Sequence, residues 1–219
     1  MSLEFVSQSK VLLPQGSREL RVEGCIEAGE IVGLQGPSGC GKSTLLRHIA
    51  QVGDAPFAMR LHDTEVLALA PNERRISLVF QRALLFPHLS VRENLRFPMR
   101  FQSPYSSWSR ELQDARIDKH LAELGLESLS SRSVVTLSGG EAMRIALVRA
   151  MVSTPKCLLL DEAFAALDKE SKALVKTWLK TRIKEHRIPT LLVAHVAEDL
   201  MDFVDRSIFW PEPGRPLQF

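Results

Sequence analysis

The stretch Gly36-Pro-Ser-Gly-Cys-Gly-Lys-Ser-Thr44 decides the fold, because it is a complete G-x-x-x-x-G-K-[ST] phosphate-binding loop. Residues 30–35 before it are mostly apolar and predict the strand that leads into such a loop. The glycines let the backbone wrap a phosphate chain closely, with N–H groups pointing inward at a helix N-terminus. Lys42 supplies a positive charge for the β- and γ-phosphates, and the Ser43 hydroxyl suits a Mg²⁺ ion.

The composition is that of an ordinary globular protein. Of 219 residues, 45% are apolar and 25% are charged, so we expect one main core with room for a smaller subdomain. The net charge is +2 without a long basic tract, and we expect no nucleic-acid partner. No stretch approaches the ~20 apolar residues that span a bilayer. Any association with a membrane is therefore expected through another polypeptide or the surface. Three scattered cysteines fit a reducing cytosol better than a disulfide framework.

Strand and helix patterns alternate along the chain. An antiparallel strand pair is expected at residues 3–6 and 19–26, around a turn-like segment at 14–17. Later strands are expected at 31–34, 76–80, 157–160 and 190–194, and helices from the loop to about 50, at 140–152 and at 169–186. This order predicts an α/β fold with a mostly parallel sheet.

The middle of the chain, about residues 84–138, has a helical pattern of its own. Ser90 is placed to cap a helix over residues 91–97, and Ser109 a helix over 110–124 that ends at Gly125. The expected apolar seam of this section is Leu112, Ala115, Leu121 and Leu124. We therefore expect a helical subdomain inserted into a core made of about residues 1–83 and 139–219.

Two acids, Asp161 and Glu162, follow the buried apolar strand at 157–160. Because the carboxyl ends of parallel strands face the ligand in phosphoryl-transfer folds, Asp161 is placed to hold Mg²⁺ directly or through water. Glu162 could polarise the attacking water. A buried strand that ends in acids is commonly a solvated edge or a helix cap, and it is the phosphate loop in the same chain that favours catalysis.

The segment Leu137-Ser-Gly-Gly-Glu141 resembles the signature motif of ATP-binding cassette (ABC) ATPases. With the phosphate loop, Gln81, Asp161-Glu162, Ala166-Leu-Asp168 and His195, it follows the motif order of that family over nearly the whole chain. The resemblance implies one ABC ATPase domain over residues 1–219: an α/β P-loop NTPase (RecA-like) core with N-terminal antiparallel strands and an inserted α-helical subdomain. It also implies a head-to-tail dimer, identical or paired, that sandwiches two ATP molecules between one subunit's phosphate loop and the other's signature.

The resemblance assigns roles residue by residue. Glu162 is the catalytic base, assisted by Gln81, His195 and Lys42. The implied Mg²⁺ ligands are Ser43, Gln81 and Asp161. The implied nucleotide contacts are Gly36, Pro37, Ser38, Gly39, Cys40, Gly41, Lys42, Ser43, Thr44, Gln81, Ser138, Gly139, Gly140 and His195.

Several of these residues also have plain structural interpretations. A single histidine at a strand end, such as His195, is more often structural. Asp168 resembles the aspartate at the family's dimer interface, and it equally suits the N-cap of the helix that follows it. Residues 83–94 resemble the region that receives a coupling helix from a membrane subunit, and their apolar side chains could equally form the core of the helical subdomain.

The sequence departs from the family pattern at four places. Residues 10–13 offer no aromatic side chain to stack on adenine, so we expect only modest discrimination between ATP and GTP. Glu141 stands where glutamine is commoner, and an acid is also favourable at a helix N-terminus. Ala163 replaces a proline and Val196 an aspartate. None of these changes removes a named catalytic group, and we expect turnover.

The resemblance implies the ATP-hydrolysing subunit of a membrane ABC transporter, closest to importer subunits. The implied partners are permease subunits and, through them, a solute-binding protein. The implied location is peripheral, at the cytoplasmic face of the inner (plasma) membrane. Two alternatives stay open at this point: a soluble ABC ATPase that acts on DNA ends or ribosomes, and a regulatory module that closes on ATP with weak turnover.

Overall fold

The computed structural model describes residues 2–12, 19–50, 59–61, 64–66, 69–70, 72–212 and 215–219, without the side chains of 5–12 and 19–20. The chain divides into two compact units. The first comprises Met1–Leu78, Lys156–Glu162 and Arg182–Phe219, and the second Val79–Pro155 and Ala163–Thr181. The turn expected at residues 14–17 lies outside the described residues. Within the described part, no helix combines the length and apolar character needed to cross a membrane.

The first unit is built around a five-stranded sheet with the strand order β6-β7-β8-β3-β9. The strands are β3 (Ile31–Gln35), β6 (Ile76–Val79), β7 (Cys157–Asp161), β8 (Thr190–Val193) and β9 (Arg206–Phe209). β3 pairs in parallel with β8 and β9, and β7 pairs in parallel with β8. Every residue of β7 and β8 is buried, which explains their continuous apolar runs. The expected parallel sheet is therefore confirmed.

The antiparallel pair expected at the N-terminus belongs to a second sheet, with the order β10-β2-β1-β4-β5. Its strands are β1 (Leu3–Leu12), β2 (Glu19–Ile26), β4 (Met59–Leu61), β5 (Thr64–Glu65) and β10 (Leu217–Gln218). β1 continues beyond the expected residues 3–6, because its register with β2 shifts between Phe5 and Ser9 and pairing then resumes. The strands β4, β5, β9 and β10 were not predicted. Each has only two to four residues and contains no run of three apolar residues, whereas the equally short β8 contains Leu-Leu-Val.

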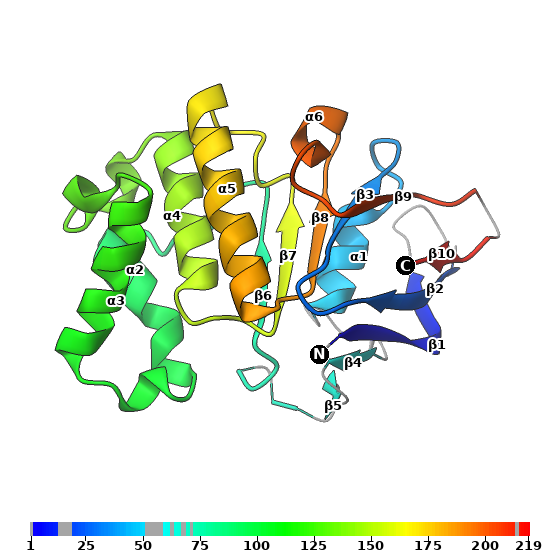
Figure 1. Cartoon of the computed structure of the whole chain (residues 1–219), viewed down its shortest axis with the longest axis horizontal. Coiled ribbons are helices and arrows are strands. Elements are labelled where there is room, and N and C mark those ends of the chain that lie inside the picture. The colour runs from blue at the N-terminus through cyan, green and yellow to red at the C-terminus, as the bar shows by residue number, and fades with distance from the viewer. Residues whose placement is uncertain are drawn as a thin grey trace. The chain divides into compact units, whose positions relative to one another are not determined.

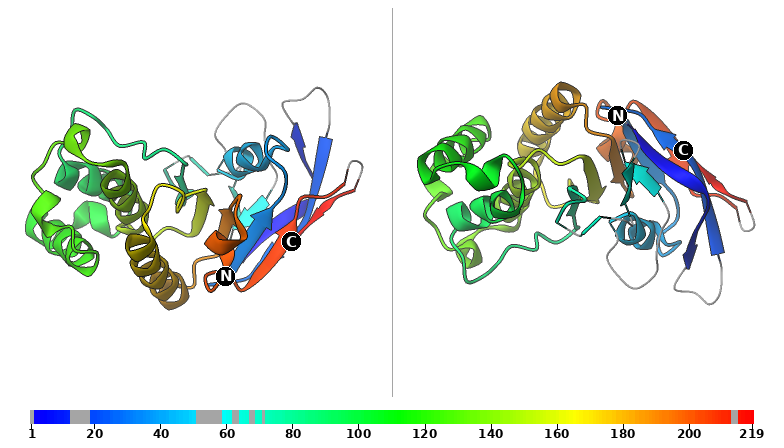
Figure 2. Two further views of the ribbon diagram at one scale, coloured as in Figure 1. Left: turned by 90° about the horizontal axis from the view of Figure 1, so that it is seen from above. Right: turned by 90° about the horizontal axis from the view of Figure 1, so that it is seen from below.

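Helix α1 (Lys42–Ile49) joins the two sheets through one core (Figure 1; Figure 2). Leu45, Leu46 and Ile49 of α1 are completely buried in this core. The sheet residues in the same core include Leu3, Val22, Ile26, Val32, Leu34, Leu159, Leu191 and Val193. Because these buried apolar residues hold α1 against both sheets, the first turn of α1, which follows the phosphate loop, has a fixed position.

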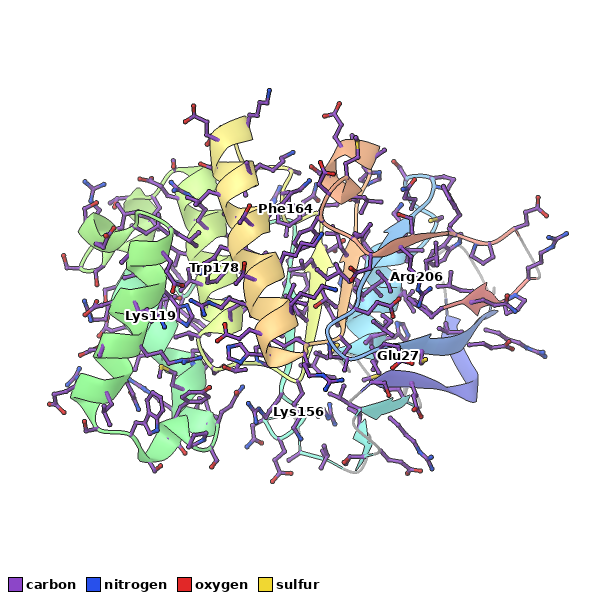
Figure 3. All side chains as sticks on the ribbon, in the orientation of Figure 1. Glu27, Lys119, Lys156, Phe164, Trp178 and Arg206 are labelled. Atoms are coloured by element: carbon purple, nitrogen blue, oxygen red, sulfur yellow. The ribbon has the colours of Figure 1, made fainter. Side chains whose placement is uncertain are left out.

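The second unit is mainly helical. Its helices are α2 (Val91–Arg96), α3 (Arg110–Glu123), α4 (Gly139–Met151) and most of α5 (Lys169–His186). Ser90 and Ser109 cap α2 and α3 as expected, and Ser90 forms a capping box with Glu93. Trp178 of α5, labelled in Figure 3, donates a hydrogen bond from Nε1 to Glu123 Oε2 at 2.8 Å. This hydrogen bond links α5 to α3.

The expected apolar seam on α3 is wrong at two of its four positions. Leu112 is 56% exposed, and Ala115 is exposed as well. The buried residues of α3 are instead Gln113, Ile117, His120 and Leu121. The Gln113 amide donates a hydrogen bond to the Tyr105 carbonyl at 2.9 Å, so a polar residue occupies an inner position. An apolar pattern cannot predict such a residue, because a satisfied polar group is as compatible with burial as a leucine.

Asn94 fixes the segment that precedes α2. Its fully buried side chain accepts a hydrogen bond from Phe86 N at 2.8 Å. Its amide donates to the carbonyls of Phe86, Leu89 and Ser90 at 3.0–3.3 Å. In the expected coupling region, Val91 is fully buried and Leu84 is 56% exposed. The apolar residues of this region therefore include both core and surface positions.

Candidate phosphate-binding and catalytic site

The phosphate loop connects β3 to α1 within the first unit, as the sequence predicts. Gly39 and Gly41 take φ values of 75° and 115°, a conformation that favours glycine. Gly41 is the N-cap of α1, and the helix begins at Lys42. The loop therefore ends at a helix N-terminus, where backbone N–H groups have no partner within the helix.

Gly36 leaves no room for a side chain. A Cβ atom added there would lie 2.5 Å from Cβ of Trp210. Trp210 follows β9, and its N–H donates a hydrogen bond to the Gln35 carbonyl at 2.7 Å. The sequence did not point to Trp210, because only the pairing of β9 with β3 brings it beside the loop.

The Lys42 side chain turns back over the loop. Its ammonium group donates hydrogen bonds to the carbonyls of Gly36 and Pro37, both at 2.8 Å, and lies 3.8 Å from Cys40 Sγ. Lys42 is only 4% exposed. A positive charge that is largely removed from water acts more strongly on a nearby phosphate than an exposed one.

Ser43 and Asp161 meet across the site. The Ser43 hydroxyl donates a hydrogen bond to Asp161 Oδ1 at 2.9 Å. Asp161 is the last residue of β7, and it is 6% exposed. Burial raises the pKa of the Asp161 carboxyl, while the Ser43 hydrogen bond and the charges of Arg47 and Lys42 oppose that rise. Two oxygen-bearing side chains from separate elements thus converge beside the loop.

Glu162 and His195 are in direct contact. Nε2 of His195 lies 2.6 Å from Oε1 of Glu162. Glu162 takes a φ of 51°, which is uncommon outside glycine, and its N–H donates to the Val193 carbonyl at 2.9 Å. The other ring nitrogen of His195, Nδ1, lies 3.4 Å from Ser38 Oγ of the phosphate loop. Backbone conformations of this kind are often found at functional sites.

The first unit therefore brings together the loop, Asp161, Glu162 and His195, and the second unit carries the other expected site residues. Gln81 follows β6 and is exposed. Asp168 accepts a hydrogen bond at Oδ1 from Ser171 N at 2.9 Å, so the expected cap at the start of α5 is confirmed. The side chains of residues 10–13, where an adenine-stacking aromatic is missing, lie outside the described part.

The signature segment opens α4, also as expected. Ser138 is the N-cap, and Gly139 and Gly140 form the first turn. The Glu141 carboxylate accepts hydrogen bonds from Ser138 N at 2.8 Å and Ser138 Oγ at 2.7 Å. These hydrogen bonds, the backbone one foremost, lower the pKa of Glu141. The substitution of glutamine by Glu141 thus preserves a capping box.

Comparison with known proteins relates this chain to ATP-binding proteins of ABC transporters. A family model described as "ABC transporter" matches residues 20–165. The chain is 39% identical over 185 residues to the sulfate/thiosulfate import ATP-binding protein CysA of Nocardia farcinica, covering 83% of this chain and 54% of that protein. It is 37% identical over 194 residues to the spermidine/putrescine import ATP-binding protein PotA of Fusobacterium nucleatum, covering 88% and 50%. The chain thus spans about half the length of the curated relatives it matches.

Solved structures resemble the chain over nearly its whole length. The dimeric structure of MJ0796, described as a bacterial ABC transporter cassette, has a TM-score of 0.81 at 25% identity and covers 99% of this chain and 94% of that one. A dimeric post-hydrolysis state of MJ0796 bound to ADP and Pi has a TM-score of 0.81 at 26% identity, covering 98% and 97%. These similarities confirm the fold class expected from the sequence.

Proposed function

The chain belongs to the ABC transporter family, and from that premise we propose that it is an ATP-binding subunit that hydrolyses ATP to drive solute transport through a membrane partner. The observation that carries the proposal is the convergence of four features in one unit. These are the phosphate loop, the Lys42 ammonium group, the Ser43–Asp161 pair and the Glu162–His195 pair.

ATP would bind with its phosphates in the loop of residues 36–44. The N–H groups at the start of α1 favour an anion, and the glycines permit close approach of the backbone. The Lys42 ammonium group would exchange its two carbonyl partners for phosphate oxygens, which carry more negative charge. We expect weak selectivity for the base.

The Ser43 and Asp161 oxygens fit a Mg²⁺ ion. Mg²⁺ prefers oxygen ligands and keeps several waters, so a hydroxyl and a carboxylate that lie 2.9 Å apart suit it. We assign these two residues and Gln81 as its protein ligands. When bound, the ion would neutralise charge that develops on the β- and γ-phosphates.

Glu162 would act as the general base. A water molecule attacks the γ-phosphorus, the bond from that phosphorus to the β,γ-bridging oxygen breaks, and the water proton passes to the Glu162 carboxylate. The products are ADP and inorganic phosphate. His195 would lie beside the γ-phosphate, with its ring held by Glu162 at 2.6 Å. Ser138, Gly139 and Gly140 of a paired subunit would cover the same phosphate with the N-terminus of α4.

We assign as partners a second ABC subunit, identical or paired, permease subunits in the membrane and, through the permease, a solute-binding protein. The location would be peripheral, at the cytoplasmic face of the plasma membrane. The support is that CysA and PotA are import ATP-binding proteins. We also retain the division into a RecA-like core of about residues 1–83 and 139–219 and a helical subdomain of about 84–138.

Steady-state release of phosphate from Mg²⁺-ATP tests the enzymatic part of the proposal. The wild-type chain should turn over, and Lys42→Ala should reduce turnover to near background, because the loop loses its buried cation. If the wild-type chain hydrolyses no ATP, either alone or with membrane partners, the result would favour the alternative of a regulatory module that closes on ATP.

Affinity purification from a mild detergent extract, followed by mass spectrometry, tests the transport part. Recovery of a multi-span membrane polypeptide, with faster ATP hydrolysis in the complex than in the free chain, would support the permease assignment. Recovery of ribosomal or DNA-associated partners in its place would favour the soluble ABC ATPase.

A further inference from the structure

His195 lies between a carboxylate and a hydroxyl group, and the hydroxyl belongs to the phosphate loop. Its Nε2 is 2.6 Å from Glu162 Oε1, and its Nδ1 is 3.4 Å from Ser38 Oγ. We propose that Ser38 is a positioning residue, whose hydroxyl holds Nδ1 so that the Nε2–H bond points at Glu162. This inference rests on the proposed function, because it concerns how that reaction is prepared.

The chemistry of the three groups fixes the hydrogen positions. An ionised carboxylate only accepts hydrogen bonds, so the ring atom that faces Glu162 must carry the hydrogen. A neutral ring then has its lone pair on Nδ1, and the Ser38 hydroxyl donates to it. A charged ring would donate from Nδ1 to the Ser38 oxygen. In both states Ser38 is the second anchor of the ring, and the bond at one nitrogen sets the state of the other.

The register of the sheet brings His195 close to both Glu162 and Ser38. Val193 of β8 pairs with Leu34 of β3 on one side and with Asp161 of β7 on the other. The strands β3, β7 and β8 therefore end at the same level of the sheet, with β8 between the other two. His195 follows the central strand, and its two partners follow the strands on either side. Glu162 is held directly by the sheet, because its N–H donates to the Val193 carbonyl at 2.9 Å, and Ser38 follows the end of β3 by three residues, within the phosphate loop.

The contact links the phosphate loop to the catalytic base. Ser38 is exposed and the His195 side chain is 40% exposed, so both are accessible to an arriving nucleotide. The distance of 3.4 Å is long for a hydrogen bond, and catalytic hydrogen bonds often tighten only once the substrate is bound. Loss of the hydroxyl should therefore impair the chemical step more than ATP binding.

The test uses the full chain with Ser38→Ala, Ser38→Thr and the control Ser207→Ala, which removes an exposed hydroxyl on β9 of the same unit. The first measurement is the ¹⁵N NMR spectrum of the His195 ring without nucleotide, assigned by its loss in His195→Gln. We expect the Nε2–H tautomer in the wild-type protein. In Ser38→Ala the Nδ1 resonance should move toward that of an unbonded nitrogen, and Ser38→Thr should restore it.

The second measurement is steady-state ATP hydrolysis. Ser38→Ala should lower kcat about 5- to 20-fold, the size expected for one hydrogen bond, with KM for ATP within about twofold. Ser38→Thr should recover most of the rate, and Ser207→Ala should match the wild type. A raised KM with unchanged kcat would overturn the proposal, because Ser38 would then serve nucleotide binding alone.

The NMR measurement is independent of turnover. A neutral ring protonated on Nδ1 in the wild-type protein, or an Nδ1 resonance unchanged in Ser38→Ala, would overturn the proposal even if Ser38→Ala hydrolyses ATP slowly. Conversely, a chain that never hydrolyses ATP would contradict the proposed function, while the ring measurement would still decide the role of Ser38. If Ser38→Ala does not fold, Ser38→Gly removes the same hydroxyl, and an unchanged Nδ1 resonance in that variant would overturn the proposal.

Discussion

Replacing Glu162 by glutamine should separate ATP binding from ATP hydrolysis. Glutamine keeps the size of the side chain, and its amide oxygen can still accept from His195 Nε2, which lies 2.6 Å from the present carboxylate. The side chain is 14% exposed, so solvent provides little substitute for the lost carboxylate. The change therefore removes the proton acceptor and leaves the surrounding contacts largely in place.

The expected loss is that of a general base. Such groups contribute about 10²- to 10⁴-fold to rates, so kcat should fall by that factor, equal to about 3–5 kcal/mol in the activation free energy. KM for ATP should change little. With hydrolysis blocked, an ATP-bound dimer should accumulate and appear as a larger species in size-exclusion chromatography with Mg²⁺-ATP.

Phosphate release and size-exclusion chromatography should be run together on Glu162→Gln and on Glu127→Gln. Glu127 is exposed at a 3₁₀ turn of the second unit, so its neutralisation controls for the change in net charge. Glu127→Gln should hydrolyse ATP at the wild-type rate. Wild-type turnover in Glu162→Gln would refute the assignment of Glu162 as the base.

Three further predictions concern stability. Gly36→Ala should lower the free energy of unfolding by about 1–3 kcal/mol in urea titrations, because its Cβ would lie 2.5 Å from Trp210 Cβ. This cost should vanish when both proteins compared carry Trp210→Gly, and should persist when both carry Trp210→Ala, which keeps the clashing atom. Asn94→Ala should cost about 1–3 kcal/mol, because it removes the acceptor of the Phe86 N–H and empties a fully buried position, while exposed Asn72→Ala should cost nothing measurable; equal effects would contradict this. Burial raises the pKa of the Cys157 thiol from 9.0 to about 12, so stability is intact below pH 9 and is lost as the pH rises toward 12. Between pH 8 and 10 the stability advantage of the wild type over Cys157→Ala should shrink by about 1.4 kcal/mol, and a constant difference would show that the thiol does not stay neutral in the folded state.

Local features of the sequence predicted the elements of the site well. The phosphate loop, the caps at Ser90 and Ser109, the helix that begins at the signature, and the strands before Asp161 and His195 all lie within a residue or two of their expected places. Each depends on interactions among residues a few positions apart: a cap, a turn or an apolar run. Such interactions are encoded locally, and they can be inferred without knowledge of the tertiary structure.

Features that depend on distant partners could not be inferred in this way. Leu112 is exposed on α3 while Gln113 is buried, because the partner of Gln113 is a carbonyl from another segment. Trp210 follows a four-residue strand, and only the pairing of β9 with β3 brings it to Gly36. The helical pattern and the strand pattern contain no information about either partner.

The contact of His195 with Ser38 and Glu162 depends on the strand order. Along the chain the three strands come in the order β3, β7, β8, whereas in the sheet β8 lies between the other two. A sequence-ordered sheet would put β7 in the centre and separate His195 from the loop by an intervening strand, about 5 Å further away. Even with the correct order, a one-residue slip of β8 would turn its side chains to the opposite face of the sheet. The motif residues therefore indicate which groups take part, while the register of Val193 with both Leu34 and Asp161 determines that they meet.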